Sequence, residues 1–121
     1  MLWERLARPW QCCLEEAWLA YCSGSTPIGA AIADATGYII ARGRNRIYDA
    51  VGEGTHLHGH DLAHAEVNAL VTLDYADLDR QTCALYTTTE PCPLYIKLRV
   101  SPTWRDLVRC KLTGMRAVRK G

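Results

Sequence analysis

Two stretches decide the fold of this chain: residues 63–70, Ala63-His64-Ala65-Glu66-Val67-Asn68-Ala69-Leu70, and residues 89–93, Thr89-Glu90-Pro91-Cys92-Pro93. The first places a carboxylate two residues after an imidazole, and the second places a thiol directly after a proline. Imidazole and thiolate are donors that zinc prefers, and a nearby carboxylate can carry protons. Together the two stretches predict a metal site with an acid–base residue beside it.

The placing of these donors at the starts of helices supports that prediction. A catalytic zinc site usually has three protein ligands and leaves a fourth position for water. We expect His64 to begin one helix and Cys92 to begin another, where the partial positive charge of a helix N-terminus favours the thiolate form. Glu66 lies two residues from His64, so it points away from the metal-facing direction and can meet the water.

A regular pattern precedes these stretches, from Trp10 to Tyr21. Large apolar side chains recur there at spacings of four, four and three, with acidic side chains on the other side. This spacing predicts one amphipathic helix. The stripe consists of Trp10, Leu14, Trp18 and Tyr21, opposite Glu15 and Glu16.

Strands are predicted on both sides of the His64 helix. Two apolar runs at residues 28–33 and 38–41, separated by Asp34-Ala35-Thr36-Gly37, predict a β-hairpin. Residues 83–88 read as a buried strand, and residues 106–110 as a further strand. The order of helices and strands indicates an α/β layered domain with helices on a mixed sheet.

The segment between the hairpin and the His64 helix is unusual. Residues 42–61 are polar and contain glycine, which predicts a loop of about twenty residues, and such loops in small domains often serve a function. We expect Asp61 to cap the helix that follows and residues 67, 70, 71 and 73 to form its inner face. His56, His58 and His60 alternate within the loop and could line up as ligands, but a solvated loop is the favoured interpretation. Cys12, Cys13 and Cys83 are interpreted as packing residues.

With two further stretches, these motifs resemble the zinc-dependent cytidine and deoxycytidylate deaminase superfamily. Pro27-Ile28-Gly29-Ala30 resembles the strand that opens the substrate pocket, and Gly43-Arg44-Asn45-Arg46 resembles the segment with the family's asparagine. The resemblance runs from about residue 10 to residue 94. It is closest to the branch of tRNA adenosine deaminases and guanine deaminases, in which Glu precedes Pro-Cys.

The resemblance implies a cytidine-deaminase-like fold, a three-layer α/β/α arrangement with a mixed sheet, formed by residues 1–121 as one domain. It implies hydrolytic deamination of a nucleobase or nucleoside, with zinc as cofactor, and a homodimer. The roles it implies are zinc ligation by His64 and Cys92, proton transfer by Glu66, and substrate binding by Asn45 and by backbone groups of Ala65 and Pro91.

The sequence departs from the family pattern at Tyr95, where the second cysteine of Pro-Cys-x-x-Cys is required. Phenolate is an uncommon zinc ligand, and two ligands hold a catalytic zinc poorly. Lys97 and Arg99 follow where small and apolar residues are usual. A changed reading frame or a degenerate gene end would explain these departures together, whereas the strand-like residues 106–110 argue for a continuous, diverged sequence.

Charge changes at the same point. Residues 1–94 hold six of the 14 Lys and Arg and 12 of the 13 Asp and Glu, whereas residues 95–121 hold the other eight basic residues and only Asp106. A basic tail is more often a solvated end than an RNA contact, yet it keeps an RNA-directed deaminase acting on tRNA as an alternative. The other alternative is a non-catalytic member that kept the pocket and lost the metal.

The bulk properties indicate a cytoplasmic globular protein. No stretch reaches the roughly 18 apolar residues that span a bilayer, which predicts no membrane association. The first residues lack the uninterrupted apolar segment of a signal peptide. The six cysteines are irregularly spaced, so reduced thiols are expected.

Overall fold

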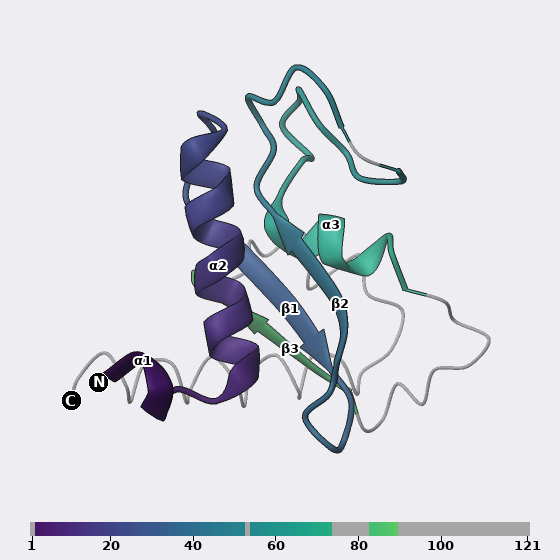
Figure 1. The fold of residues 1–121 in the computed structure, drawn as a ribbon. Helices are drawn as coiled ribbons and strands as arrows, with labels where there is room; N and C mark the ends of the chain where they lie inside the picture. The colour runs from purple at the N-terminus through teal and green to yellow at the C-terminus, as the bar shows by residue number, and fades with distance from the viewer. Residues whose placement is uncertain (1, 53, 74–82, 90–121) are drawn as a thin grey trace.

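The computed structural model describes residues 2–52, 54–73 and 83–89. Its elements follow in the order α1 (Leu2–Arg5), α2 (Arg8–Cys22), β1 (Gly29–Ala33), β2 (Ile39–Arg44), α3 (Ala65–Leu70) and β3 (Ala84–Thr87) (Figure 1). The helix, hairpin and strand predicted before residue 90 are therefore confirmed. The helix predicted from Cys92 and the strand predicted at 106–110 lie outside the described residues. No described helix has the length and apolar character needed to cross a membrane.

The described strands form one sheet in the order β2-β1-β3, with β1 antiparallel to both neighbours. The hairpin closes through the Asp34 amide, which donates to the Tyr38 carbonyl at 2.9 Å. Gly37 has a φ of 87°, a left-handed conformation that glycine adopts without steric cost. A parallel pair, which a mixed sheet requires, would need a strand beyond these three.

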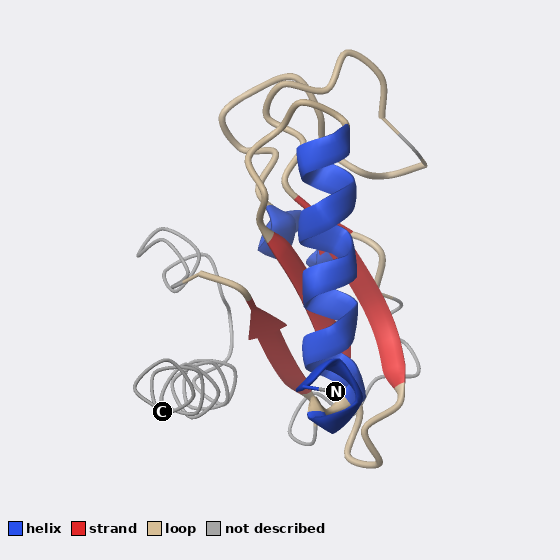
Figure 2. Cartoon of the chain, turned by 60° about the vertical axis from the view of Figure 1, so that its left-hand side comes forward, coloured by secondary structure: helices blue, strands red, loops and turns tan. Residues whose placement is uncertain are grey.

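Alternation along the strands divides the core into two layers. Ala30 and Ile32 of β1 pack with Cys83 and Leu85 on the α3 side, whereas Ala31 packs with α2 on the other side. Figures 1 and 2 show the long helix α2 across one face of the sheet and α3 on the opposite face. Because successive strand residues point to opposite faces, one sheet buries two apolar surfaces, and the α/β/α arrangement is confirmed.

Two glycines allow the helices to approach the sheet closely. A Cβ added to Gly29 would lie 2.0 Å from the Cys13 carbonyl oxygen of α2, and one added to Gly43 would lie 2.3 Å from the Ala69 nitrogen of α3. Both atoms belong to backbone, which cannot swing aside as a flexible side chain does. Gly29 and Gly43 therefore set the spacing between the sheet and its two helices.

The buried face of α2 differs from its stripe of large apolar residues. Leu14, Trp18 and Tyr21 are 43%, 63% and 62% exposed. Trp10 packs against the sheet, edge-on to Tyr86 with ring centroids 4.8 Å apart. The helix buries small side chains instead, because the close approach at Gly29 leaves no room for large ones. The buried residues of α2 are Pro9, Cys12, Cys13, Glu16, Ala17 and Ala20.

Two buried ionisable side chains on this face of α2, Glu16 and Cys13, avoid an uncompensated charge in different ways. Glu16 accepts a hydrogen bond from Arg42 Nε of β2 at 2.5 Å, an ion pair between helix and strand. Burial raises the pKa of the Cys13 thiol, which keeps that thiol protonated. Cys12 and Cys13 are fully buried, as are Cys83 and its neighbours on the other face, so their interpretation as packing residues is confirmed.

For α3, the predicted N-cap was wrong and the predicted inner face was correct only in part. His64, and not Asp61, occupies the N-cap position of α3. The inner face is made by Ala65, Asn68 and Ala69, whereas Val71 is 39% exposed. The physical reason is again the close approach at Gly43, which selects alanines over branched side chains. The predicted inner residues 70 and 73 only border the core, and residue 67 is half-buried.

Candidate active site

The predicted site residues of the described chain gather where β2 ends and α3 begins. The Arg46 amide donates to the Ala63 carbonyl at 2.8 Å, and Asn68 Nδ2 donates to the Arg44 carbonyl at 3.0 Å. The two neighbours of Asn45 are therefore both bonded to this region: Arg44 to α3, and Arg46 to Ala63, the residue just before His64. The structure brings Asn45 to the start of the helix that carries His64.

The first residues of β1 and the end of β3 reach the same end of the sheet. Asn45 donates its backbone N–H to the Ile28 carbonyl at 3.0 Å. Gly29 exchanges hydrogen bonds with Thr88, whose amide donates to the Gly29 carbonyl at 3.1 Å. Thr88, which shortly precedes Pro91 and Cys92 in the sequence, thus lies beside Gly29, and the preceding residue Ile28 is bonded to Asn45.

The side chain of Asn45 is oriented by its own backbone. It is 1% exposed, and its Oδ1 accepts the Ile47 amide at 3.1 Å. The carboxamide oxygen is occupied by this turn, so Nδ2 is the atom left to donate outward. Among the described residues no acceptor contacts that Nδ2.

His64 and Glu66 occupy the first turn of α3 in different environments. His64 is half-buried at the N-cap, with φ −82° and ψ 156°. Glu66 is only 3% exposed, and its Oε1 accepts a hydrogen bond from Thr87 Oγ1 of β3 at 2.8 Å. Ala65 between them is fully buried against β2. The carboxylate is thus held against the sheet while the imidazole lies nearer the surface.

Asn68 organises the long loop that separates Asn45 from His64. Its Oδ1 accepts the Leu57 amide at 2.7 Å, and its Nδ2 donates to the Leu57 carbonyl at 3.1 Å as well as to Arg44. The side chain is fully buried. A single amide therefore joins the middle of the loop to both β2 and α3.

Charged groups fix the beginning of the same loop. Asp49 pairs with Arg46 at 3.3 Å and with Arg44 at 3.6 Å, and it accepts the Ser25 hydroxyl at 2.6 Å. The Tyr48 amide in turn donates to the Ser25 hydroxyl at 3.2 Å. Because the two arginines flank Asn45, this network fixes the backbone on each side of it.

The alternating histidines do not form a metal site within the described chain. His58 and His60 are exposed, and His60 Nδ1 accepts the Leu62 amide at 3.2 Å, while His56 is half-buried. Across residues 2–52, 54–73 and 83–89, no three His, Cys, Asp or Glu side chains gather as a metal site would require.

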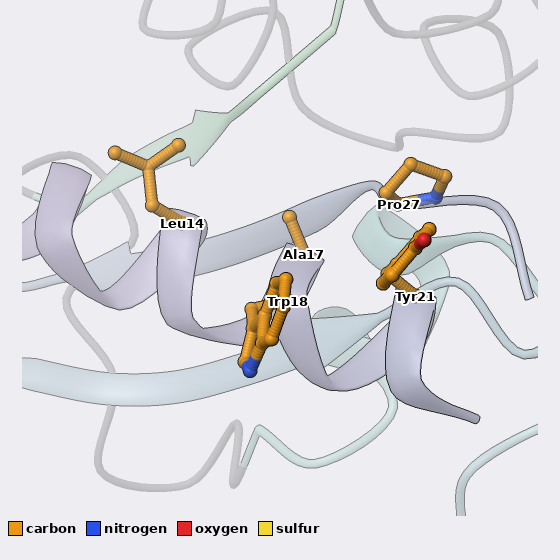
Figure 3. A pocket seen from close by; sticks show the side chains of 5 residues that line it. All are labelled: Leu14, Ala17, Trp18, Tyr21 and Pro27. Carbon is orange, nitrogen blue, oxygen red and sulfur yellow. The ribbon is translucent and has the colours of Figure 1, made fainter.

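An apolar groove lies on the outer face of α2, away from these residues. It is lined by Leu14, Ala17, Trp18, Tyr21 and Pro27 and has a volume of about 330 Å³ (Figure 3). The rings of Trp18 and Tyr21 stack beside it with centroids 5.5 Å apart. None of the described site residues, Asn45, His64, Ala65 and Glu66, lines this groove.

The donor chemistry fits zinc at two of three positions. The imidazole of His64 and the thiolate of Cys92 are usual zinc ligands, whereas the phenol of Tyr95 is not. Cys92, Tyr95 and the predicted substrate contact Pro91 lie outside the described residues.

Sequence reasoning missed two residues of the site, Thr87 and Asn68. Thr87 follows Cys83 and Leu85 at the two-residue period of a strand, and this period places all three on the α3 side of the sheet. That signal could have identified Thr87 as a neighbour of the helix that carries Glu66. Asn68 gave no comparable signal, because its partners come from two distant segments.

Comparison with solved structures places the chain beside two deaminases. It shares 31% identity, at a TM-score of 0.56, with a structure from a study of A-to-I editing by tRNA:A34 deaminases at the wobble position of transfer RNA, covering 74% of this chain and 62% of that one. It shares 30% identity, at a TM-score of 0.55, with guanine deaminase from Bacillus subtilis, covering 70% of this chain and 50% of that one. The chain therefore matches less than two thirds of the length of either structure.

Comparison with known families gives a match along most of the chain. A search of curated proteins found no match. The model of the cytidine and deoxycytidylate deaminase zinc-binding region matches residues 4–108, which include His64, Glu66 and Cys92 and extend past Tyr95. The chain is therefore a member of the cytidine and deoxycytidylate deaminase zinc-binding family.

Proposed function

We propose that this protein is a zinc-dependent hydrolytic deaminase of a nucleobase or nucleoside, with activity impaired by Tyr95. The observation that carries the proposal is the placing of buried Glu66, next to His64, at the end of the sheet where Asn45 is held. Such a site contains a proton carrier, a metal donor and an amide donor for a ring. The family match supports the reaction class.

The reaction replaces an amino group on a ring carbon by a carbonyl oxygen: water is consumed and ammonia is released. His64 and Cys92 would hold zinc, with Tyr95 at the third-ligand position. A zinc ion in such a site supplies a Lewis acid that makes water a competent nucleophile near neutral pH. Proton transfer and substrate binding depend on the protein's own residues.

Glu66 moves the protons of this reaction. It accepts a proton from the attacking water and delivers it to the ring nitrogen, then takes the second proton from the hydroxyl added to the ring carbon and passes it to the departing amine, which leaves as ammonia as the carbonyl forms. General acid–base catalysis of this kind contributes about 10²- to 10⁴-fold in rate. Asn45 would donate from Nδ2 to an acceptor on the substrate, and backbone groups of Ala65 and Pro91 would contact the ring.

A small base or nucleoside is the substrate class that we favour, and a homodimer is the assembly that we expect. The similarity to guanine deaminase supports a free base. The similarity to a tRNA deaminase structure, together with eight basic residues in 95–121, supports tRNA as the second candidate.

Ammonia release tests the proposal. The unmodified protein, Tyr95→Cys, and the double variant Tyr95→Cys/Glu66→Gln would be loaded with zinc and offered guanine, adenine, cytosine and their nucleosides. We expect Tyr95→Cys to release ammonia from at least one of them and the double variant to lose that activity. Ammonia release that persists without Glu66 would contradict its assignment as the proton carrier.

Asn45→Ala in the Tyr95→Cys protein should raise KM while the protein stays folded.

The same proteins separate the two substrate classes. An RNA-directed enzyme would bind tRNA with an affinity that falls steeply with salt, because basic residues displace counterions from phosphates. Turnover of free bases without salt-sensitive tRNA binding would support the favoured class. A folded Tyr95→Cys protein that holds zinc but deaminates neither class would support a non-catalytic member of the family.

A further inference from the structure

Thr87 contacts Glu66 in the interior of the protein. Thr87 Oγ1 donates to Glu66 Oε1 at 2.8 Å, and the two residues are 2% and 3% exposed. A hydrogen bond to a charged acceptor is stronger than one between neutral groups, and water does not compete for it at such a buried position.

The position of Thr87 in β3 explains why the contact forms. Cys83 and Leu85 pack on the α3 side of the sheet, and Thr87 continues their two-residue alternation at the end of the strand. Glu66 lies in the first turn of α3, which covers that side. A hydroxyl in this register therefore donates to the carboxylate, which an apolar side chain at position 87 could not do.

The hydroxyl has a second contact that sets its direction. The Thr89 amide donates to Thr87 Oγ1 in a long contact of 3.5 Å. An ionised carboxylate can only accept, so the Thr87 proton points to Glu66 while its oxygen accepts from the backbone. This short chain joins Glu66 to residues 87–89, which directly precede Glu90-Pro91-Cys92.

We infer that Thr87 is a positioning residue for Glu66: it fixes the orientation of the carboxylate that transfers protons. The inference rests on the proposed function, in which Glu66 is the proton carrier. Groups that orient a functional side chain without touching substrate typically contribute about 10- to 100-fold in activity. Thr87 itself touches neither substrate nor metal in this account.

Three variants separate positioning from simple packing. Thr87→Val keeps the branched shape that suits a strand but removes the hydroxyl, and Thr87→Ser keeps the hydroxyl. Thr72→Val is the control, because Thr72 lies beyond the end of α3 and its hydroxyl donates to the Ala69 carbonyl. Circular dichroism and thermal unfolding would establish that each variant is folded.

The first readout needs no turnover. Carbon-13 NMR of the metal-free protein, labelled at the glutamate carboxyl carbon, would report the Glu66 resonance, assigned by its loss in Glu66→Gln. We expect Thr87→Val to shift this resonance, Thr87→Ser to return it toward its original position, and Thr72→Val to leave it unchanged. A resonance that does not move in a folded Thr87→Val protein would overturn the inference.

The second readout is the split between kcat and KM in the Tyr95→Cys protein. We expect Thr87→Val to lower kcat by about 10- to 100-fold with KM within about twofold, and Thr87→Ser to recover most of kcat. Equal losses in the valine and serine variants would overturn the inference. If no variant turns over any base while the carboxyl resonance responds as expected, the deaminase proposal fails and the positioning of Glu66 by Thr87 is supported.

Discussion

Asn68 is the side chain on which the geometry of the long loop depends. Its amide bonds both backbone groups of Leu57 and the carbonyl of Arg44, and it is fully buried. Buried backbone groups that lose a partner cost about 1–3 kcal/mol, since no water replaces it. The candidate site therefore depends on a residue whose side chain bonds the backbone of Leu57 and Arg44.

Replacing Asn68 should destabilise the protein far more than replacing an exposed residue with a similar task. Thr55 also connects the loop to α3, through a hydroxyl that donates to the Val71 carbonyl at 3.3 Å, but it is exposed. We expect Asn68→Ala to lower the free energy of unfolding by about 2–3 kcal/mol and Thr55→Ala by under about 0.5 kcal/mol. Urea unfolding measures both, and hydrogen exchange at the Leu57 amide should accelerate only in Asn68→Ala. Equal effects of the two changes would contradict this account of the loop.

Individual site residues were predictable to different degrees. His64 and Glu66 could be proposed from their motif and Asn45 from the family resemblance, whereas Asn68 looks like an ordinary polar residue within a helix. Its importance arises from Arg44 and Leu57, which only the folded chain brings to it. Side chains that bond backbone from distant segments leave no periodic signal in a sequence.

At the scale of elements, periodicity predicted helices and strands well and buried faces less well. The stripe of large apolar residues correctly indicated a helix over 10–21, yet α2 turns Leu14, Trp18 and Tyr21 outward. The deciding contact is between backbones, at Gly29, and it selects small residues for the buried face. Hydrophobicity alone does not carry that steric information.

A small change in β1 beneath α2 should therefore cost more stability than a large change on the exposed face of α2. A Cβ at Gly29 would lie 2.0 Å from the Cys13 oxygen and 2.7 Å from the Ala17 nitrogen. We expect Gly29→Ala to destabilise the fold by about 1–3 kcal/mol or more, because overpacking shifts backbone. Trp18→Gln, on the exposed face of α2, should change stability by no more than about 0.5 kcal/mol. Chemical denaturation of both variants checks this, and a larger loss in Trp18→Gln would refute the assignment of faces.

At the scale of the whole molecule, the order of helices and strands predicted an α/β layered domain, and the resemblance to the deaminase family implied the three-layer α/β/α arrangement. The described part of the chain supplies His64, Glu66 and Asn45 of the candidate site, with Glu66 bonded to Thr87 and with both neighbours of Asn45 bonded to the region of α3. The other half was predicted from Pro91-Cys92, and the family match continues past Tyr95 to residue 108. That continuity favours a diverged sequence over a changed reading frame.

The zinc content of the purified protein tests the central claim most directly. A histidine and a cysteine leave two of four coordination positions without a usual protein ligand, so the unmodified protein should carry well under about one zinc per chain. Elemental analysis should show Tyr95→Cys rising toward about one, and Tyr95→Cys with His64→Ala falling back again. Full occupancy in the unmodified protein, or occupancy in the double variant equal to that of Tyr95→Cys, would contradict a zinc site built on His64, Cys92 and position 95.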